Sequence, residues 1–375
     1  GLIAVLVGYT SSVAIIFQAA EAAGVNDAQA NSWMLALGLG MGISGLILSL
    51  RYRMPILTAW STPGAALMVV ALPGVGIEYA TGAFVFSAVL LTLTGITGWF
   101  ERLSRIIPDG IASAMLAGIL FQFGLSVFTS MQTDLTLVGV MCITYLAARM
   151  LLPRFAIPVV LVAGIAFAWI TGNFDAGQAV ALEFARPEFV MPAFSIPVLI
   201  SVGLPLYIVT MTSQNMPGVV TLKTLGYEPP VSAALTVTGL TTLVLAPFGG
   251  YAFNLAAITA AICAGAEADE DPKTRYRAVI VAGVLYCLVG LFGATIIALF
   301  ALAPTALVVT IAGLALLGTI GNSLAVAVAE DRQREAALVT FLTTVSGISF
   351  FDIGSAVWGL LFGAAVYVVQ ARKTA

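Results

Sequence analysis

The feature that most constrains this chain is a series of apolar runs, many of them about 20 residues long, divided by short clusters of charged or turn-forming residues. Because lipid offers the backbone no hydrogen-bond partners, runs of this length must form helices. Only 9% of the residues are charged and 60% are hydrophobic, whereas soluble domains average about 25% charged residues. The sequence therefore predicts an all-α polytopic membrane protein.

About 14 transmembrane segments are expected from the spacing of these runs. The third and the tenth are short and are interrupted by glycine or proline. In chain order the runs cover 1–20, 30–50, 55–72, 78–99, 108–128, 134–151, 155–171, 193–214, 230–247, 252–265, 275–299, 304–328, 335–350 and 354–371.

The distribution of basic residues predicts the orientation. With the N-terminus in the cytoplasm, every lysine and arginine except Arg186 falls in a cytoplasmic loop, as the positive-inside rule requires. We therefore expect a multi-pass protein of a bacterial inner (plasma) membrane with both termini in the cytoplasm.

The longest predicted external loop, 172–192, divides the segments into two groups of seven. An odd number in each half forces the halves into opposite orientations, which is the arithmetic of an inverted repeat. The fifth and twelfth segments begin alike, with Pro108 and Pro304, although short apolar similarities also arise by chance.

The two short segments are the most informative part of the chain. Each has an extended aromatic stretch, around Trp60 or Tyr251, followed by small helix-forming residues. A half-helix that starts inside the membrane presents unpaired N–H groups and partial positive charge, so two facing starts suit an anion. Ser61, Thr62 and Asn254 are candidate N-caps. The alternative is that proline and glycine merely kink packed helices.

The eighth segment is unusually polar for a membrane span. Its Tyr207, Thr210 and Gln214 follow the i, i+3, i+7 spacing of one helical face. That face could line a polar cavity, or its side chains could form ordinary hydrogen bonds between helices.

Titratable groups are scarce within the predicted spans. The chain has no histidine, the commonest metal ligand and proton shuttle. Its three cysteines lie in apolar stretches without a metal-binding spacing, and no basic run suggests nucleic acid. We therefore expect no metal, no cofactor and no enzyme activity. Glu21, near the end of the first segment, is the candidate for proton coupling.

Several motifs resemble the benzoate membrane transport protein family (BenE), whose members are benzoate:proton symporters. They are Gly203-Leu-Pro-Leu, Gln214-Asn-Met-Pro-Gly218, Pro247-Phe-Gly-Gly-Tyr-Ala-Phe-Asn254 and Arg275-Tyr-Arg277. The resemblance covers nearly the whole chain. It implies the seven-plus-seven inverted repeat of nucleobase/ascorbate transporters and sulfate permeases, with short strands before the half-helices of segments 3 and 10.

The resemblance also implies two domains. Residues 1–106 and 193–300 would form a core domain that carries the substrate. Residues 107–192 and 301–375 would form a gate domain, through which a homodimer is possible. Proton-coupled uptake would then follow an elevator-type motion of the core.

The chain departs from the nucleobase transporters of this fold at one informative position. They carry a glutamate directly before the asparagine of the tenth segment, where this chain has Phe253 before Asn254. A phenylalanine beside free amides suits benzoate or a similar aromatic carboxylate. Another small anion or a nucleobase remains the alternative substrate. The predicted substrate-binding residues are Phe17, Ser61, Thr62, Gly64, Ala65, Tyr207, Thr210, Gln214, Tyr251, Phe253, Asn254, Leu255 and Ala256, with Trp60 as a further ring contact.

Overall fold

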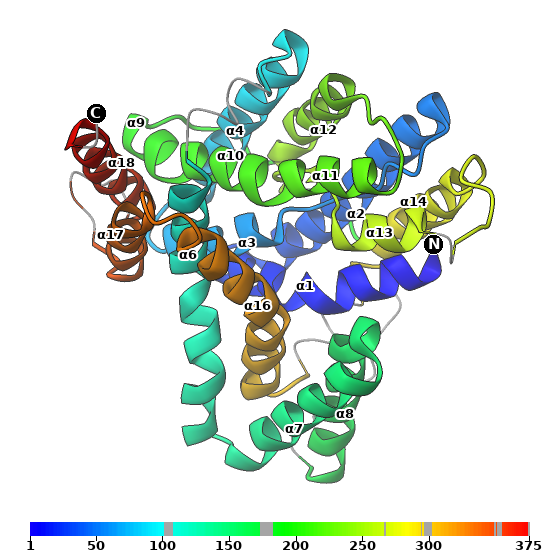
Figure 1. Ribbon diagram of the computed structural model, residues 1–375. Coiled ribbons are helices and arrows are strands. Elements are labelled where there is room, and N and C mark those ends of the chain that lie inside the picture. The colour runs from blue at the N-terminus through cyan, green and yellow to red at the C-terminus, as the bar shows by residue number, and fades with distance from the viewer. Residues whose placement is uncertain are drawn as a thin grey trace.

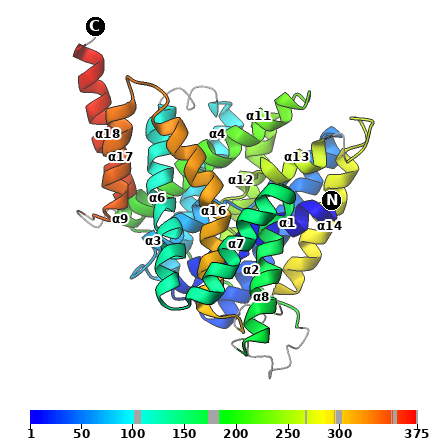
Figure 2. The same ribbon diagram turned by 60° about the horizontal axis from the view of Figure 1, so that its bottom comes forward.

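The computed structural model describes residues 1–100, 108–172, 183–265, 268–293, 295, 302–348, 350 and 355–373. These residues form a bundle of helices, most of which run along the apolar stretches of the sequence (Figures 1 and 2). The first half contains α1 (Leu2–Ala22), α2 (Asp27–Tyr52), α3 (Thr62–Ala71), α4 (Ile77–Thr97), α6 (Asp109–Thr129), α7 (Leu135–Leu151) and α8 (Ala156–Ile170).

The second half opens with a long helical run made of five pieces: α9 (Ile196–Val198), η3 (Leu199–Gly203), α10 (Leu204–Thr210), η4 (Met211–Asn215) and α11 (Met216–Thr224). Among the described residues it is followed by α12 (Val231–Leu245), α13 (Ile258–Ala264), α14 (Tyr276–Leu291), α16 (Thr305–Ala327), α17 (Arg334–Val345) and α18 (Ser355–Lys373). Short 3-10 turns cover Ser130–Gln132, Pro153–Phe155 and Ala246–Phe248.

The lengths of these helices confirm a multi-pass membrane protein. Within the described ranges, six helices are long and apolar enough to cross a membrane, or seven if the bent α1 is counted. Shorter apolar helices accompany them. Large apolar side chains on the outside of the bundle, such as Ile143 on α7 and Ile170 on α8, are largely exposed, as expected for a surface that lipid covers.

Two short strands that are far apart in sequence pair within the described residues. β1 (Thr58–Ala59) precedes α3 and β2 (Asn254–Leu255) precedes α13, and the two pair antiparallel. Thr58 lies opposite Leu255, and Ala59 lies opposite Asn254. The expected strands before the third and tenth helices are therefore present, and their pairing holds the two half-helices together although they are far apart in sequence.

Glycines allow the helices of this region to approach closely. α2 packs against α14, where the Cα of Gly290 lies directly beside Gly38 and leaves no room for a side chain. α4 packs against α12, where Gly239 lies beside the backbone of Thr92. In lipid the hydrophobic effect does not drive helices together, so close van der Waals contact at small residues stabilises such crossings instead.

The remaining helices form a second set of contacts. α6 packs against α16 and α17, α17 packs against α18, and α7 packs against α8. Figure 1 shows α17 and α18 at one side of the molecule and α7 and α8 at its lower end, both away from α12 and α14. α1 and α3 lie between the two sets, because α1 contacts α16 and α3 contacts α6.

Candidate functional site

The start of α3 is built by a serine cap. Ser61 has an extended backbone, and its Oγ accepts a hydrogen bond of 3.0 Å from the N–H of Gly64. Pro63 lies in the first turn, where its missing N–H costs nothing. A Cβ at Gly64 would lie 2.7 Å from Leu206 Cδ1, so the eighth segment packs directly against this helix start. The predicted cap at Ser61 is confirmed.

The start of α13 is built differently. The helix begins at Ile258, and the preceding Ala257 offers no side-chain cap. Asn254 lies in β2, and pairing continues one residue beyond that strand, because the N–H of Ala256 donates to the carbonyl of Leu57 over 2.9 Å. The prediction that Asn254 caps the half-helix is therefore wrong: strand pairing holds this stretch extended and delays the helix start.

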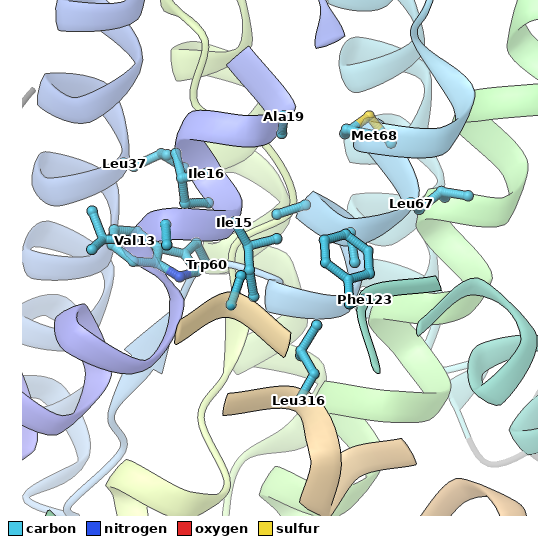
Figure 3. Packing of buried hydrophobic residues seen from close by; sticks show 14 of the residues in the cluster. Val13, Ile15, Ile16, Ala19, Leu37, Trp60, Leu67, Met68, Phe123 and Leu316 are labelled. Carbon is cyan, nitrogen blue, oxygen red and sulfur yellow. The ribbon is translucent and has the colours of Figure 1, made fainter. Parts of the chain in front are cut away.

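Side chains of α1 and α2 hold β1 in place. The Thr58 hydroxyl donates to the carbonyl of Met41 over 2.7 Å and lies 2.8 Å from the Ser44 hydroxyl. Nε1 of Trp60 donates to Ser12 Oγ on α1 over 2.8 Å. Figure 3 shows Trp60 in the buried cluster beside Val13 of α1.

The second half of the chain holds β2 in a similar way. The N–H of Leu255 donates to Asn215 Oδ1 of the eighth segment over 3.0 Å. The N–H of Phe253 donates to Thr242 Oγ1 of α12 over 3.1 Å. Sequence reasoning assigned no role to Asn215 or Thr242, although Asn215 belongs to the polar stretch that made the eighth segment conspicuous.

The two aromatic residues before Asn254 point into the helical scaffold. The ring of Phe253 lies against Gly40 of α2, close enough to exclude a Cβ there. The ring of Tyr251 packs on Trp33 and Phe84, with ring centroids 5.5 and 5.0 Å away. Both side chains are fully buried, and these contacts are with α2 and α4.

Asn254 is fixed by its own backbone. Its Nδ2 donates to the carbonyl of Ala252 over 2.9 Å, whereas its buried Oδ1 has no hydrogen-bond partner among the described residues. Ala252 has a φ of 50°, in the left-handed region that costs a residue with a Cβ about 1–2 kcal/mol. A strained turn thus directly precedes a polar side chain with an unused acceptor, an arrangement typical of functional sites.

The eighth segment contains two π-helical stretches, η3 and η4. Such stretches are rare and occur frequently at functional sites. The Tyr207 hydroxyl forms a 2.7 Å hydrogen bond with that of Thr94 on α4. Thr210 is buried and its Oγ1 has no partner among the described residues, while Gln214 is half-buried.

The other predicted residues lie at different depths. Ala65, Leu255 and Ala256 are buried, and the Cβ of Leu255 lies where a Cβ of Gly218 would point. Thr62 and Phe17 are half-buried. Glu21 lies in the last turn of α1, and its side chain is exposed and not enclosed by the bundle.

A cavity of about 780 Å³ lies at the C-terminal end of α3. It extends between α3, the start of the eighth segment, α6 and the α17–α18 pair. Its polar lining side chains are those of Tyr79, Gln122, Ser195, Ser201, Thr344 and Ser355, and no lining side chain among the described residues carries a charge. Leu67, one of its lining residues, is about 8 Å along α3 from Thr62. Figure 3 shows Leu67 and Met68 on α3, with Phe123 of α6 nearby.

Comparison with known proteins gives the following matches. The family model described as BenE, benzoate membrane transport protein, matches residues 1–369. The inner membrane protein YdcO of Escherichia coli (strain K12) is 48% identical over 369 residues, which cover 98% of this chain and 94% of the relative. The benzoate membrane transport protein of Acinetobacter baylyi is 41% identical over 377 residues, covering 100% of this chain and 95% of the relative.

Solved structures match the fold. SLC26A9 superposes with a TM-score of 0.60 at 12% identity, over 99% of this chain and 65% of that protein. The transmembrane domain of the cyanobacterial bicarbonate transporter BicA superposes with a TM-score of 0.52 at 15% identity, over 98% of this chain and 94% of that domain. At these identities the likeness concerns the fold alone.

Proposed function

Because the chain belongs to the benzoate membrane transport protein (BenE) family, a family of transporters, we propose that it takes up benzoate or a similar aromatic carboxylate together with a proton. The observation that carries this proposal is the family match over residues 1–369, joined by 41% identity to a protein named for benzoate transport. The 48% identical YdcO, an inner membrane protein by name, supports the same location for this chain.

An inverted repeat of seven plus seven segments accounts for the helix contacts. If the halves are equivalent, the second segment corresponds to the ninth and the fourth to the eleventh. The repeat then relates α2 to α12 and α4 to α14, so the contact of α2 with α14 is equivalent to that of α12 with α4. In the same way, the contact of α7 with α8 is equivalent to that of α17 with α18. The anchoring of the strands follows the same symmetry. Thr58 and Trp60 bond to the second and first segments, and Phe253 and Leu255 bond to the ninth and eighth segments.

The proposed core domain comprises residues 1–106 and 193–300, and the gate domain comprises 107–192 and 301–375. The tight, glycine-lined crossings of α2 with α14 and of α4 with α12 fall within the core. The cavity of about 780 Å³ lies between α3 and the eighth segment on one side and α6, α17 and α18 on the other. In the proposed division it would lie between core and gate. An elevator-type motion would carry the core past the gate, with both termini in the cytoplasm and a homodimer formed through the gate.

In the proposed site, the starts of α3 and α13 supply N–H groups and partial positive charge to the carboxyl group of the substrate. Thr62 and Gly64 on one side, and Asn254 with Ala256 on the other, belong to this site. Thr210 and Gln214 of the eighth segment contribute polar contacts. The scaffold contacts of Phe253 and Tyr251 support a role in shaping the strand, with the aromatic ring of the substrate packed elsewhere.

The alternative function is transport of another small anion or a nucleobase by the same fold, since a bicarbonate transporter shares it. Binding assays on the purified protein with benzoate, salicylate, uracil and sulfate separate these functions. The proposal expects the two aromatic carboxylates to bind at least tenfold more tightly than uracil or sulfate. Equal or tighter binding of uracil or sulfate would overturn it.

A further inference from the structure

Asn254 offers a ligand one kind of hydrogen bond only. The carbonyl of Ala252 can only accept, so the 2.9 Å bond fixes Nδ2 of Asn254 toward it. The free end of the amide is therefore Oδ1, an acceptor that is fully buried and has no partner among the described residues. A buried acceptor without a donor is destabilising, so a ligand that supplies a donor is favoured at this position.

The register of the strands turns Asn254 away from the scaffold. Successive side chains of a strand point to opposite faces, and directly opposed residues share a face. Thr58 points to α2, where it bonds to Met41, and its partner is Leu255. Ala59 and Asn254 therefore share the other face, next to the start of α3.

Protein groups that could supply a proton near Asn254 are lacking in the described structure. The elements that pack most closely against β2 are β1, α12 and η4, and none of these contains an acidic, basic, cysteine or tyrosine residue. α11 also touches Leu255 through Gly218, and its one charged residue, Lys223, is exposed in the last turn of that helix. Along the sequence, the titratable residue nearest to Asn254 is Tyr251, whose ring packs on Trp33 and Phe84. No Asp or Glu side chain in the described part of the chain is buried.

The cavity at the C-terminal end of α3 has the same character. Its described lining has an amide and several hydroxyl groups but no cation to compensate a carboxylate. Moving an unpaired carboxylate into such surroundings is far costlier than moving its neutral acid.

We propose that the transporter binds its aromatic substrate as the neutral carboxylic acid, with the acid O–H donating to Asn254 Oδ1. The N–H of Thr62 would donate to the carbonyl oxygen of the acid, because Pro63 has no N–H and the N–H groups of Gly64 and Ala65 already donate to Ser61. The coupled proton is then the one on the substrate: it is taken up from water outside and released to water inside, and the pair crosses with no net charge. This inference rests on the proposed function and identifies the species that the site binds.

The test is the pH dependence of ligand binding to the purified wild-type protein between pH 5 and pH 8. A carboxylic acid has a pKa of about 4, so its neutral fraction falls tenfold for each pH unit above that. The apparent Kd for benzoate should rise by the same factor of ten per unit, because only the neutral fraction binds. Benzamide, which is neutral and keeps an N–H donor for Asn254, should compete for the site with a Kd that does not change with pH.

Two variants test the role of Asn254 itself. Asn254→Leu should lose at least tenfold in affinity for both benzamide and benzoate at pH 5, whereas Val89→Leu, at an exposed position of α4, should bind as the wild type does. A benzoate Kd that stays flat from pH 5 to pH 8, or a failure of benzamide to compete, would overturn the inference while leaving benzoate transport standing. If benzoate bound at no pH, the proposed function itself would fail.

Discussion

The placement of the Phe253 ring against α2 can be tested through Gly40. A Cβ added at Gly40 would lie within 2.5 Å of three atoms of that ring, where ordinary contacts are 3.4–4 Å. The ring is fully buried and therefore has little room to move by the missing ångström. Overpacking of this kind costs about 1–3 kcal/mol, and we expect the upper half of that range for Gly40→Ala.

The assay is equilibrium unfolding in detergent micelles, followed by tryptophan fluorescence. Gly139→Ala on α7 is the matched control, because a Cβ there meets nothing within 4 Å and alanine favours the helix by about 1 kcal/mol. The double variant Gly40→Ala with Phe253→Leu should recover at least about 1 kcal/mol relative to the sum of the single changes. If Gly40→Ala were as stable as Gly139→Ala but bound no benzoate, the ring would face the ligand and our placement of Phe253 would be refuted.

Four further predictions address the site, the cavity and the proton. Asn215→Leu should leave the buried N–H of Leu255 without an acceptor, destabilising the protein by about 1–3 kcal/mol and weakening benzoate binding; unchanged unfolding and binding would show that this bond does not hold β2. Val70 lines the cavity and is 45% exposed, so Val70→Trp should fill the cavity and reduce benzoate uptake in vesicles at least tenfold. Val89→Trp, outside the cavity, should not reduce uptake, and equal uptake by both variants would remove the cavity from the transport path. Glu21→Gln should still accumulate benzoate in response to a proton gradient, because the exposed Glu21 is not needed when the substrate carries the proton; lost accumulation with intact exchange would assign the proton to Glu21. Hydrogen bonds from Thr274 and the Asp271 N–H, with Arg277 and Arg275 nearby, lower the pKa of Asp269 in the α13–α14 loop. Hydrogen-exchange protection of this loop should therefore be present above pH 4 and fall as the pH drops below the usual carboxyl pKa of about 4. Asp269→Asn should abolish this pH dependence.

Much of the fold could be predicted because lipid leaves few choices to the backbone. The apolar runs predicted the helix positions, and the aromatic stretches followed by small residues predicted two extended stretches that lead into half-helices. The family resemblance implied that these stretches are strands. Ser61 was predictable as a cap, since a serine followed by Pro63 is a common way to begin a helix.

The details of the site depend on pairing between distant segments, which one sequence does not reveal. Asn254 looked like a second cap, but its pairing opposite Ala59 holds it in a strand. The sequence predicted Phe253 and Tyr251 as contacts for the substrate ring, but it could not show that their rings pack on Gly40, Trp33 and Phe84. The anchoring role of Asn215 depends on the position of β2, about 40 residues further along the chain.

Coupled benzoate uptake by the purified protein in proteoliposomes tests the central claim most directly. With an inward proton gradient and labelled benzoate outside, the account predicts accumulation above equilibrium that collapses when the gradient is removed and that unlabelled salicylate, but not uracil or sulfate, inhibits. Neutral benzoic acid also enters protein-free vesicles passively. The contribution of the protein is therefore measured as the excess of the initial uptake rate over the rate in protein-free vesicles. An initial rate equal to that of protein-free vesicles, or one that persists unchanged without any proton gradient, would contradict proton-coupled benzoate transport.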